Sequence, residues 1–181
     1  LDRERFCPYL VCPADGPSLP QLETWGAPVY PMKIQGDFSL WDDLKVMAAL
    51  SHLARSLQIS IIHAHGYKAG FLSLWAGYKH KSSRLLCSFH NPLPRPPKTL
   101  HRFLARALVS ILGHRADHLI VISLSQQQEL IDLLNLPAGK ISQIYNGIDP
   151  TVFSLPPGSQ TFRRELRIDE SIPLVGTVTR L

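Results

Sequence analysis

Two periodicities of hydrophobic and polar residues alternate along the chain. Short continuous apolar runs that end in Gly, Pro, Asn or Asp predict strands, and longer stretches with apolar residues three or four positions apart predict helices. Most of the predicted strands are continuous apolar runs, which is typical of strands buried on both faces. The strands are predicted over residues 6–13, 28–32, 59–64, 84–89, 118–122, 141–145 and 172–179.

Helices are predicted between the strands. The first begins at Ser39, where Asp42 three residues later forms a capping box, and it continues at helical spacing to Leu57. Because strands alternate with helices, we expect a doubly wound parallel sheet, that is, a Rossmann-like α/β domain. The other predicted helices run through residue 74 and over residues 98–115 and 125–134.

The predicted helix over residues 98–115 is amphipathic. Lys98, Arg102 and Arg106 recur every four residues on its polar side. A solvated charged face explains such a row, and a patch for a membrane surface or a phosphorylated acceptor is the alternative. The remaining apolar residues form one stripe of the kind that faces a core: Leu100, Phe103, Leu104, Ala107, Leu108, Ile111 and Leu112.

The composition changes after Phe153. Residues 155–159 (Leu-Pro-Pro-Gly-Ser) predict a linker, and a short charged helix and the strand over residues 172–179 follow it. Because no helix follows that strand, we expect residues 1–154 to form one domain and residues 155–181 to be the linker and first strand of a truncated second domain. The chain begins without Met and without a signal peptide, so we expect it to start inside a longer protein.

Composition and charge exclude several classes of protein. Hydrophobic residues make up 45% of the sequence and charged residues 18%, so the chain can bury a core. No apolar run approaches the ~20 residues of a membrane-spanning helix. Three cysteines without Cys-x-x-Cys spacing predict reduced thiols in the cytosol and no zinc knuckle. The net charge of +5 leaves nucleic acid, an anionic membrane and phosphorylated small molecules as candidate partners.

Polar residues gather where the predicted strands end. In open α/β sheets, ligands bind at the carboxyl ends of the strands. We therefore take this edge of the sheet as the candidate site. Its residues are 63–66 (His-Ala-His-Gly), 88–91 (Ser-Phe-His-Asn), Ser123, 146–147 (Asn-Gly) and Arg180.

Five motifs follow one another in a fixed order along most of the chain. They are HAHG at residues 63–66, FHN at 89–91, ADHLIVIS at 116–123, NGID with Phe153 at 146–153, and GTVTRL at 176–181. In this order they resemble the motifs of family-4 glycosyltransferases, whose first domain ends in a strand like "ADxIIxVS" followed by "NGxDxxxF". The last motif resembles the "GxxxRL" strand that opens the second domain of these enzymes.

The resemblance implies the first, acceptor-side domain of a two-domain GT-B glycosyltransferase, without the family's first strand. It implies transfer of a sugar, a hexose for instance, from a nucleotide sugar to an acceptor hydroxyl with retention, and no metal or cofactor. The acceptor would be a sugar or a lipid-linked sugar in carbohydrate or cell-envelope biosynthesis. The protein would be cytoplasmic, with peripheral contact at the inner membrane surface, and this fragment alone would be inactive.

The resemblance also assigns roles to single residues. It places His90 beside the transferred sugar, as the catalytic residue that orients it and stabilises the charge at its anomeric carbon. It places Arg180 at the departing diphosphate, where a guanidinium stabilises negative charge. His65, Gly66 and Asn91 line the cleft on the acceptor side. Ser123 lines it as well, and helix capping explains that serine equally well.

His63 and His65 are two residues apart and therefore point to the same face of a strand. A metal-binding pair is conceivable, but no Asp, Glu or Cys stands at partner spacing nearby, and the resemblance implies no metal. We expect His63 to pack within the domain and His65 to line the cleft.

Two other functions stay open. One is a sugar-nucleotide epimerase or hydrolase on the same fold. The other is a non-catalytic half that binds an acceptor or a membrane and recruits a catalytic partner. A Lys shortly after Leu181, followed later by a pair of Glu residues, would favour the transferase. Nucleic-acid binding is the weakest option because aromatic and basic residues are not interleaved.

Overall fold

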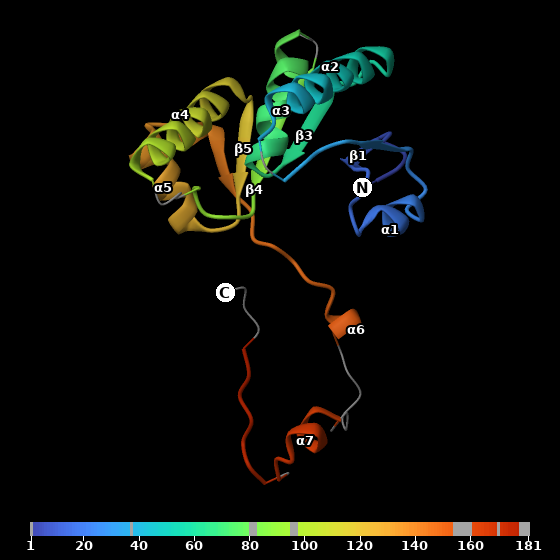
Figure 1. Cartoon of the computed structure of the whole chain (residues 1–181), viewed down its shortest axis with the longest axis vertical. Coiled ribbons are helices and arrows are strands. Elements are labelled where there is room, and N and C mark those ends of the chain that lie inside the picture. Colours follow the sequence, from blue (N-terminus) through green and yellow to red (C-terminus); the bar gives the residue numbers. More distant parts are fainter. Residues whose placement is uncertain are drawn as a thin grey trace. The chain divides into compact units, whose positions relative to one another are not determined.

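The computed structural model describes residues 2–36, 38–79, 83–94, 98–153, 161–169 and 171–177. Its residues fall into two compact units, 1–145 and 146–181. The first unit contains a four-stranded parallel sheet, whose strands follow one another in the order of the sequence (Figure 1). These strands are β3 (Ile61–His65), β4 (Arg84–Phe89), β5 (His118–Val121) and β6 (Ile141–Gln143).

A second, two-stranded sheet precedes it. Strand β1 (Leu10–Pro13) pairs in parallel with β2 (Val29–Met32), and the short helix α1 (Leu19–Glu23) connects them. The sequence pattern predicted one sheet. This prediction was wrong, because among the described residues no strand forms hydrogen bonds to both sheets. Apolar runs show which segments are strands, whereas pairing depends on which edges come within hydrogen-bonding distance.

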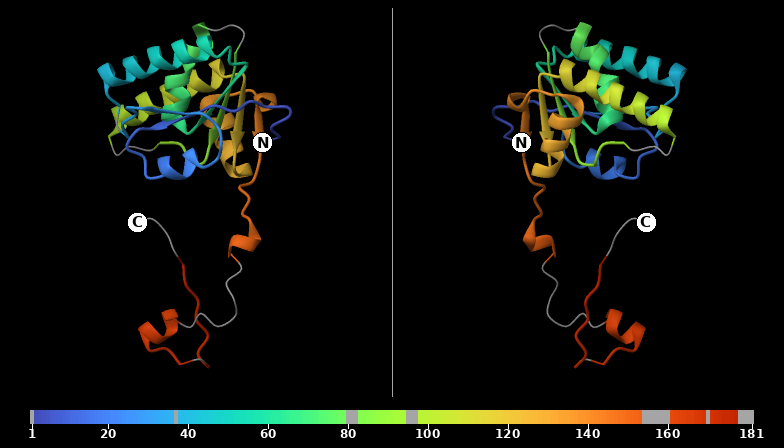
Figure 2. Two further views of the ribbon diagram at one scale, coloured as in Figure 1. Left: turned by 90° about the vertical axis from the view of Figure 1, so that its right-hand side faces the viewer. Right: turned by 90° about the vertical axis from the view of Figure 1, so that its left-hand side faces the viewer.

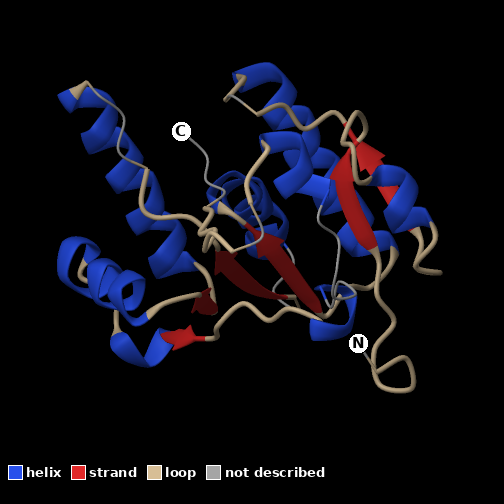
Figure 3. Cartoon of the chain, turned by 90° about the horizontal axis from the view of Figure 1, so that it is seen from below, coloured by secondary structure: helices blue, strands red, loops and turns tan. Residues whose placement is uncertain are grey.

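Four long helices pack around the strands, as the view from below shows (Figure 3). Helix α2 lies alongside α3, which packs against β3, β4 and α4 (Figure 2). Helix α5 packs against β5 and β6. The predicted α/β class is therefore confirmed. The four helices are α2 (Leu40–Ser56), α3 (Tyr67–Lys79), α4 (Thr99–Arg115) and α5 (Leu124–Leu134).

The core lies where α3, α4 and α5 meet β4 and β5. Cys87 and Phe89 of β4 and Leu119 of β5 are completely buried. Helix α3 approaches this core at Gly70, where a Cβ atom would lie 2.7 Å from Leu112 Cδ2 and 3.2 Å from Cys87 Sγ. A side chain at position 70 would therefore overlap its neighbours, and glycine allows the helix to pack closely.

Helix α4 is amphipathic, but its faces are not arranged as predicted. Val109, Leu112 and Gly113 are buried against the core. Leu108 and Ala107 are half-buried, whereas four residues of the predicted core stripe are exposed: Leu100, Phe103, Leu104 and Ile111. Helical periodicity shows which residues share a face but not which face packs, and this limitation explains the error.

Helix α2 begins at the predicted residue with a different capping partner. Ser39 N–H donates to Oδ2 of Asp43 at 2.9 Å, while the Ser39 hydroxyl lies 3.5 Å from Asp42. Asp43 is buried, and its charge is compensated there by an ion pair with Lys68 of α3 at 2.9 Å. The predicted capping residue, Asp42, is therefore corrected to Asp43, which links α2 to α3.

The second unit contains α6 (Pro150–Phe153) and the predicted short charged helix, α7 (Thr161–Leu166). The strand predicted over residues 172–179 does not form in its described part, residues 172–177. A strand is stabilised by hydrogen bonds to a neighbour, and the described residues of this unit include no other strand. The predicted boundary at residue 154 lies in residues 154–160, outside the described residues, and the domain assignment stays a prediction.

Asp117 joins β4 to β5 through reciprocal hydrogen bonds with Leu85. The Leu85 N–H donates to Asp117 Oδ2 at 2.8 Å, and the Asp117 N–H donates to the Leu85 carbonyl at 2.8 Å. Arg84 donates to the other carboxylate oxygen at 2.7 Å. Partial burial alone would raise the pKa of Asp117, but the Leu85 and Arg84 hydrogen bonds outweigh it, and the pKa lies below its ordinary value of 3.8.

We predict that Asp117→Ala lowers the free energy of unfolding by ~1–3 kcal/mol at neutral pH, because the buried Leu85 N–H loses its charged acceptor. A carboxyl group whose pKa is lower in the folded protein than in the unfolded chain stabilises the fold at pH values above its unfolded pKa. The difference from wild type should therefore shrink as the pH falls through the acid range below 3.8. Urea unfolding would measure it, with exposed Asp132→Ala as the control. If Asp117→Ala and Asp132→Ala had equal free energies of unfolding at neutral pH, the stabilising role of Asp117 would be contradicted.

Candidate functional site

The site begins where β3 and β4 end side by side. Their parallel register places His65 opposite Ser88. The Gly66 N–H donates to the Ser88 carbonyl at 2.8 Å, and Gly66 has a φ of +89°. Glycine adopts this conformation without strain, so the chain can turn directly from β3 into α3. The turn leaves His65 at the carboxyl edge of the sheet.

Three imidazole rings lie in a row along this edge. His65 Nδ1 and His90 Nε2 are 3.2 Å apart, and the two rings are stacked with centroids 5.5 Å apart. The His63 ring lies 4.3 Å from the His65 ring, and its Nε2 is 2.7 Å from the Ser88 hydroxyl. His63 is an exposed residue of the edge strand β3, so its predicted packing within the domain was wrong.

The surroundings of His63 and His65 favour the neutral forms of these two rings. Partial burial lowers the pKa of His63, and the nearby His65 and His90 lower it further. Partial burial also lowers the pKa of His65, with a further contribution from His90. A neutral pair can form a single N–H···N hydrogen bond, in which one ring donates and the other accepts. His65 Nδ1 and His90 Nε2, which are 3.2 Å apart, lie within the distance of such a bond.

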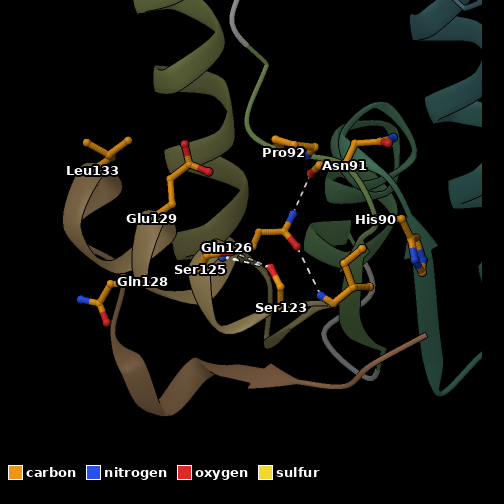
Figure 4. Close-up of a pocket in the computed structure, with 10 residues that line it drawn as sticks. His90, Asn91, Pro92, Ser123, Ser125, Gln126, Gln128, Glu129 and Leu133 are labelled. Carbon is orange, nitrogen blue, oxygen red and sulfur yellow. Dashed lines mark hydrogen bonds between the residues drawn. The ribbon is translucent and has the colours of Figure 1, made fainter. Parts of the chain in front are cut away.

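The loop after β4 is fixed by two hydrogen bonds to one carbonyl oxygen. The Asn91 carbonyl accepts from the Tyr67 hydroxyl at 3.0 Å and from Gln126 Nε2 at 2.6 Å. The side-chain oxygen of Gln126 accepts from the Ile122 N–H at 3.3 Å (Figure 4). Burial raises the pKa of Tyr67 to about 12, so its hydroxyl keeps the proton that it donates. We call this arrangement the Asn91 clamp.

Ser123 caps helix α5. Its hydroxyl oxygen accepts from the Gln126 N–H at 3.2 Å and lies 3.1 Å from the Ser125 hydroxyl. The capping explanation for Ser123 is therefore confirmed. The same serine also lines a pocket beside His90, so its two predicted roles are compatible.

This pocket has a volume of about 660 Å³ and opens at the carboxyl ends of β4 and β5. Most of its surface is apolar, and a few hydroxyl, amide, imidazole and carboxylate groups stand among the lining residues, as is usual in ligand pockets. Figure 4 shows its residues: His90, Asn91, Pro92, Ile122, Ser123, Ser125, Gln126, Gln128, Glu129 and Leu133.

The structure brings five predicted site residues to one edge: His90, Asn91 and Ser123 line the pocket, and His65 and Gly66 adjoin them. The roles of these residues in ligand binding stay predictions.

The other predicted site residues do not join this group. Lys98, Arg102 and Arg106 belong to helix α4 or its N-cap, and none of them lines the pocket. Arg180 lies outside the described residues.

The sequence prediction missed Tyr67 and Gln126. A signal for Gln126 was present, because Ser123 and Gln126 have the Ser-x-x-Gln spacing of a capping box. In the structure, the glutamine side chain reaches past the cap to Ile122 and Asn91. No comparable signal distinguishes Tyr67 from an ordinary aromatic residue at the start of a helix.

Among the residues that the structure describes, no group of three His, Cys, Asp or Glu side chains is arranged to hold a metal ion. The rings of His63, His65 and His90 follow one another along the edge of the sheet, the first pair tilted and the second pair stacked. Within the same described part of the chain, no helix combines the length and apolar character needed to cross a membrane.

Comparison with known proteins identifies the family. The model of glycosyltransferase family 4 matches residues 1–152. Since this match covers most of the chain, the chain belongs to glycosyltransferase family 4. A search of curated proteins found no match.

Solved structures share the fold. A glycosyltransferase from Rickettsia africae is 14% identical, with a TM-score of 0.66 over 92% of this chain. Anabaena HepE in complex with UDP is 22% identical, with a TM-score of 0.67 over 88% of the chain. The complex of HepE with UDP and glucose is likewise 22% identical, with a TM-score of 0.67 over 87% of the chain. The chain spans 42% of the length of the solved chain in each of these three structures.

The lowered histidine pKa values predict a pH-dependent stability. Below the ordinary pKa of 6.5, the unfolded chain binds more protons at His63 and His65 than the folded chain does. The free energy of unfolding should therefore fall as the pH is lowered from 7.5 to about 5. His65→Gln should reduce this dependence, because it removes one of the two groups and a neighbour of the other.

Urea unfolding at several pH values would measure the effect. His52→Gln, which removes an exposed histidine of α2, is the matched control and should leave the dependence on pH in place. If His65→Gln lost as much stability between pH 7.5 and about 5 as wild type does, the coupling of these rings to folding would be disproved.

Proposed function

We propose that this chain is the acceptor-side domain of a retaining, metal-independent glycosyltransferase. The enzyme transfers a hexose from a nucleotide sugar to a hydroxyl of a sugar or lipid-linked acceptor. One observation carries the proposal: in a chain of family 4, His90 is held beside a pocket at the sheet edge by His65 and by the Asn91 clamp. This is the carboxyl edge of a parallel sheet, where α/β proteins bind their ligands.

In the proposed reaction, the bond between the anomeric carbon and the diphosphate oxygen breaks, and its electron pair leaves with the diphosphate. The acceptor hydroxyl forms the new bond on the same face of the sugar, and its proton passes to the departing phosphate oxygen. His90 orients the sugar and stabilises the positive charge that develops at the anomeric carbon. A group held rigidly before the reaction is effective here because no reorganisation is needed in the transition state.

The donor is a nucleoside diphosphate sugar in this proposal. HepE, which has the same fold, was solved with UDP and with UDP and glucose. The diphosphate would be held by Arg180 and by a donor-binding domain, so little donor affinity is expected of residues 1–154 alone. Cytoplasmic localisation is part of the proposal, and it is supported by the free thiols of Cys7, Cys12 and Cys87.

We predict that His90→Ala lowers turnover by ~10²-fold or more in a protein that joins this chain to a donor-binding domain. His90 is exposed at the pocket, so the melting temperature should stay close to that of wild type. The donor KM should change much less than kcat, because the diphosphate contacts lie elsewhere. Transfer of labelled sugar to acceptor would measure both, with exposed His114→Ala of α4 as the control.

Three outcomes would decide against the proposal. A His90→Ala variant that transfers sugar at nearly the wild-type rate would remove His90 from the site. Release of free or epimerised sugar without a glycosylated acceptor would favour the hydrolase or epimerase. A wild-type protein that binds acceptor but never transfers sugar would favour a non-catalytic half with a catalytic partner.

A further inference from the structure

A second cavity lies between α3 and α4, apart from the pocket beside His90. Its volume is about 220 Å³, and Tyr67 and Phe71 of α3 line it together with Leu108 and Leu112 of α4. None of the described residues that line this cavity also lines the pocket, so the two are separate sites. We call it the α3–α4 cavity.

One wall of the α3–α4 cavity is a side chain at the surface of the protein. Phe38, which precedes α2, lines the cavity and is 60% exposed. Its ring meets the Phe71 ring edge-on, with centroids 5.9 Å apart, and Lys68 Nζ lies 5.2 Å from the centroid of the Phe38 ring. These two contacts hold Phe38 in place. Because this wall is at the surface, a ligand can enter the cavity without opening the core.

The described residues that line the α3–α4 cavity are apolar, apart from His101 and the hydroxyl of Tyr67. His101 is exposed, and the Tyr67 hydroxyl already donates to the Asn91 carbonyl at 3.0 Å. Burial raises the pKa of Tyr67 to about 12, so this hydroxyl stays neutral. A water molecule held in a cavity needs two to four polar partners, and this lining is poor in them. The cavity therefore suits an apolar ligand.

The volume and the lining of the α3–α4 cavity indicate the class of ligand. An apolar cavity of about 150 Å³ holds one benzene molecule. A volume of about 220 Å³ therefore accommodates a single aromatic ring or a fused pair of rings. Phe38, Tyr67 and Phe71 all line the cavity, and aromatic rings gain from edge-on and offset contacts with one another. An aromatic molecule should thus bind better than an aliphatic chain of similar size.

We propose that the α3–α4 cavity binds a small aromatic molecule and that this binding stabilises the Asn91 clamp. Tyr67 connects the two, because its ring lines the cavity and its hydroxyl is part of the clamp. The same ring is stacked on the buried ring of Phe89, with centroids 4.4 Å apart. If the hydroxyl left the Asn91 carbonyl, the ring would move and the wall of the cavity would change with it. The ligand therefore binds the clamped form better, which is the condition for shifting an equilibrium.

Binding in the α3–α4 cavity is thereby coupled to the edge of the pocket. Asn91 directly follows His90, whose ring lies against that of His65. A ligand that strengthens the clamp restricts His90 without touching it. Coupling of this kind is reciprocal, so a ligand that holds His90 in the pocket would also strengthen binding in the cavity. In this proposal the cavity is a regulatory site for the chemistry at His90.

The experiment is an NMR titration of the isotope-labelled chain with indole, a neutral fused pair of aromatic rings. Indole should bind saturably, with a Kd on the order of 1 mM or tighter, which lies within the affinity range of ligands of its size. Hexanol, a neutral aliphatic chain, should bind more weakly. Because the titration needs no donor, acceptor or sugar transfer, its result does not depend on the proposed reaction.

Two alanines of α4 provide a matched pair of variants. Both are half-buried, and only Ala105 is among the described residues that line the cavity, whereas Ala107 is not. Ala105→Leu should weaken indole binding at least ~10-fold, because the added side chain and the ligand cannot occupy the same space. Ala107→Leu should bind indole as wild type does. Melting curves of both variants show whether they are folded.

Tyr67→Phe separates binding from coupling, because it keeps the ring and removes the hydroxyl. In wild type, indole should shift the ring signals of His90. Tyr67→Phe should still bind indole, but the response of His90 should be at least ~3-fold smaller, since the ring no longer holds the Asn91 carbonyl. Its control is Tyr145→Phe, which removes an exposed hydroxyl outside the described lining and should keep the full response.

Four results would overturn the proposal. The first is the absence of saturable indole binding to wild type, and the second is equal binding by Ala105→Leu and Ala107→Leu. The third is tighter binding of hexanol than of indole, which would assign the cavity to an aliphatic chain. The fourth is a His90 response to indole that is absent in wild type or equally large in Tyr67→Phe, which would remove the coupling through the clamp.

Discussion

The arrangement of the candidate site depends on the carbonyl oxygen of Asn91. It accepts hydrogen bonds from two side chains, the Tyr67 hydroxyl at the start of α3 and the Gln126 amide in the first turn of α5. These helices follow β3 and β5, the strands on either side of β4. One acceptor thus ties the loop after β4 to both neighbouring strand-helix units. Because Gln126 is buried, either of its polar atoms would be costly to leave without a partner.

This constraint explains how a loop can hold an exposed histidine in one place. His90 precedes the clamped carbonyl by one residue, and on its other side it lies against the His65 ring. The clamp and the ring contact together fix His90 at the edge of the pocket. Helix α4 follows the same loop, and its exposed apolar and basic residues lie outside the pocket.

The sequence was sufficient to predict the α/β class and the residues at the strand ends. Apolar runs identify β3, β4 and β5, and parallel strands bring the following residues, His65, His90 and Ser123, to one edge. The clamp could not be predicted, because it depends on where Tyr67 and Gln126 lie in three dimensions.

Three errors in the prediction have physical causes. The apolar residues of α4 divide between the core and the solvent, although their spacing is that of one stripe. The segment 172–177 has the composition of a strand but no neighbouring strand among the described residues. Asp43 rather than Asp42 accepts from the Ser39 N–H, because the ion pair with Lys68 holds Asp43 in place.

The most direct test of the account is NMR spectroscopy of a Gln126→Leu variant of this chain. Its control is Gln128→Leu, which changes an exposed glutamine of the same helix. If the clamp positions His90, the ring signals of His65 and His90 should shift or broaden in Gln126→Leu. The Ile122 amide should then exchange with solvent at least ~10-fold faster, because it loses its acceptor. Unchanged ring signals and unchanged Ile122 exchange in a folded Gln126→Leu protein would contradict the account.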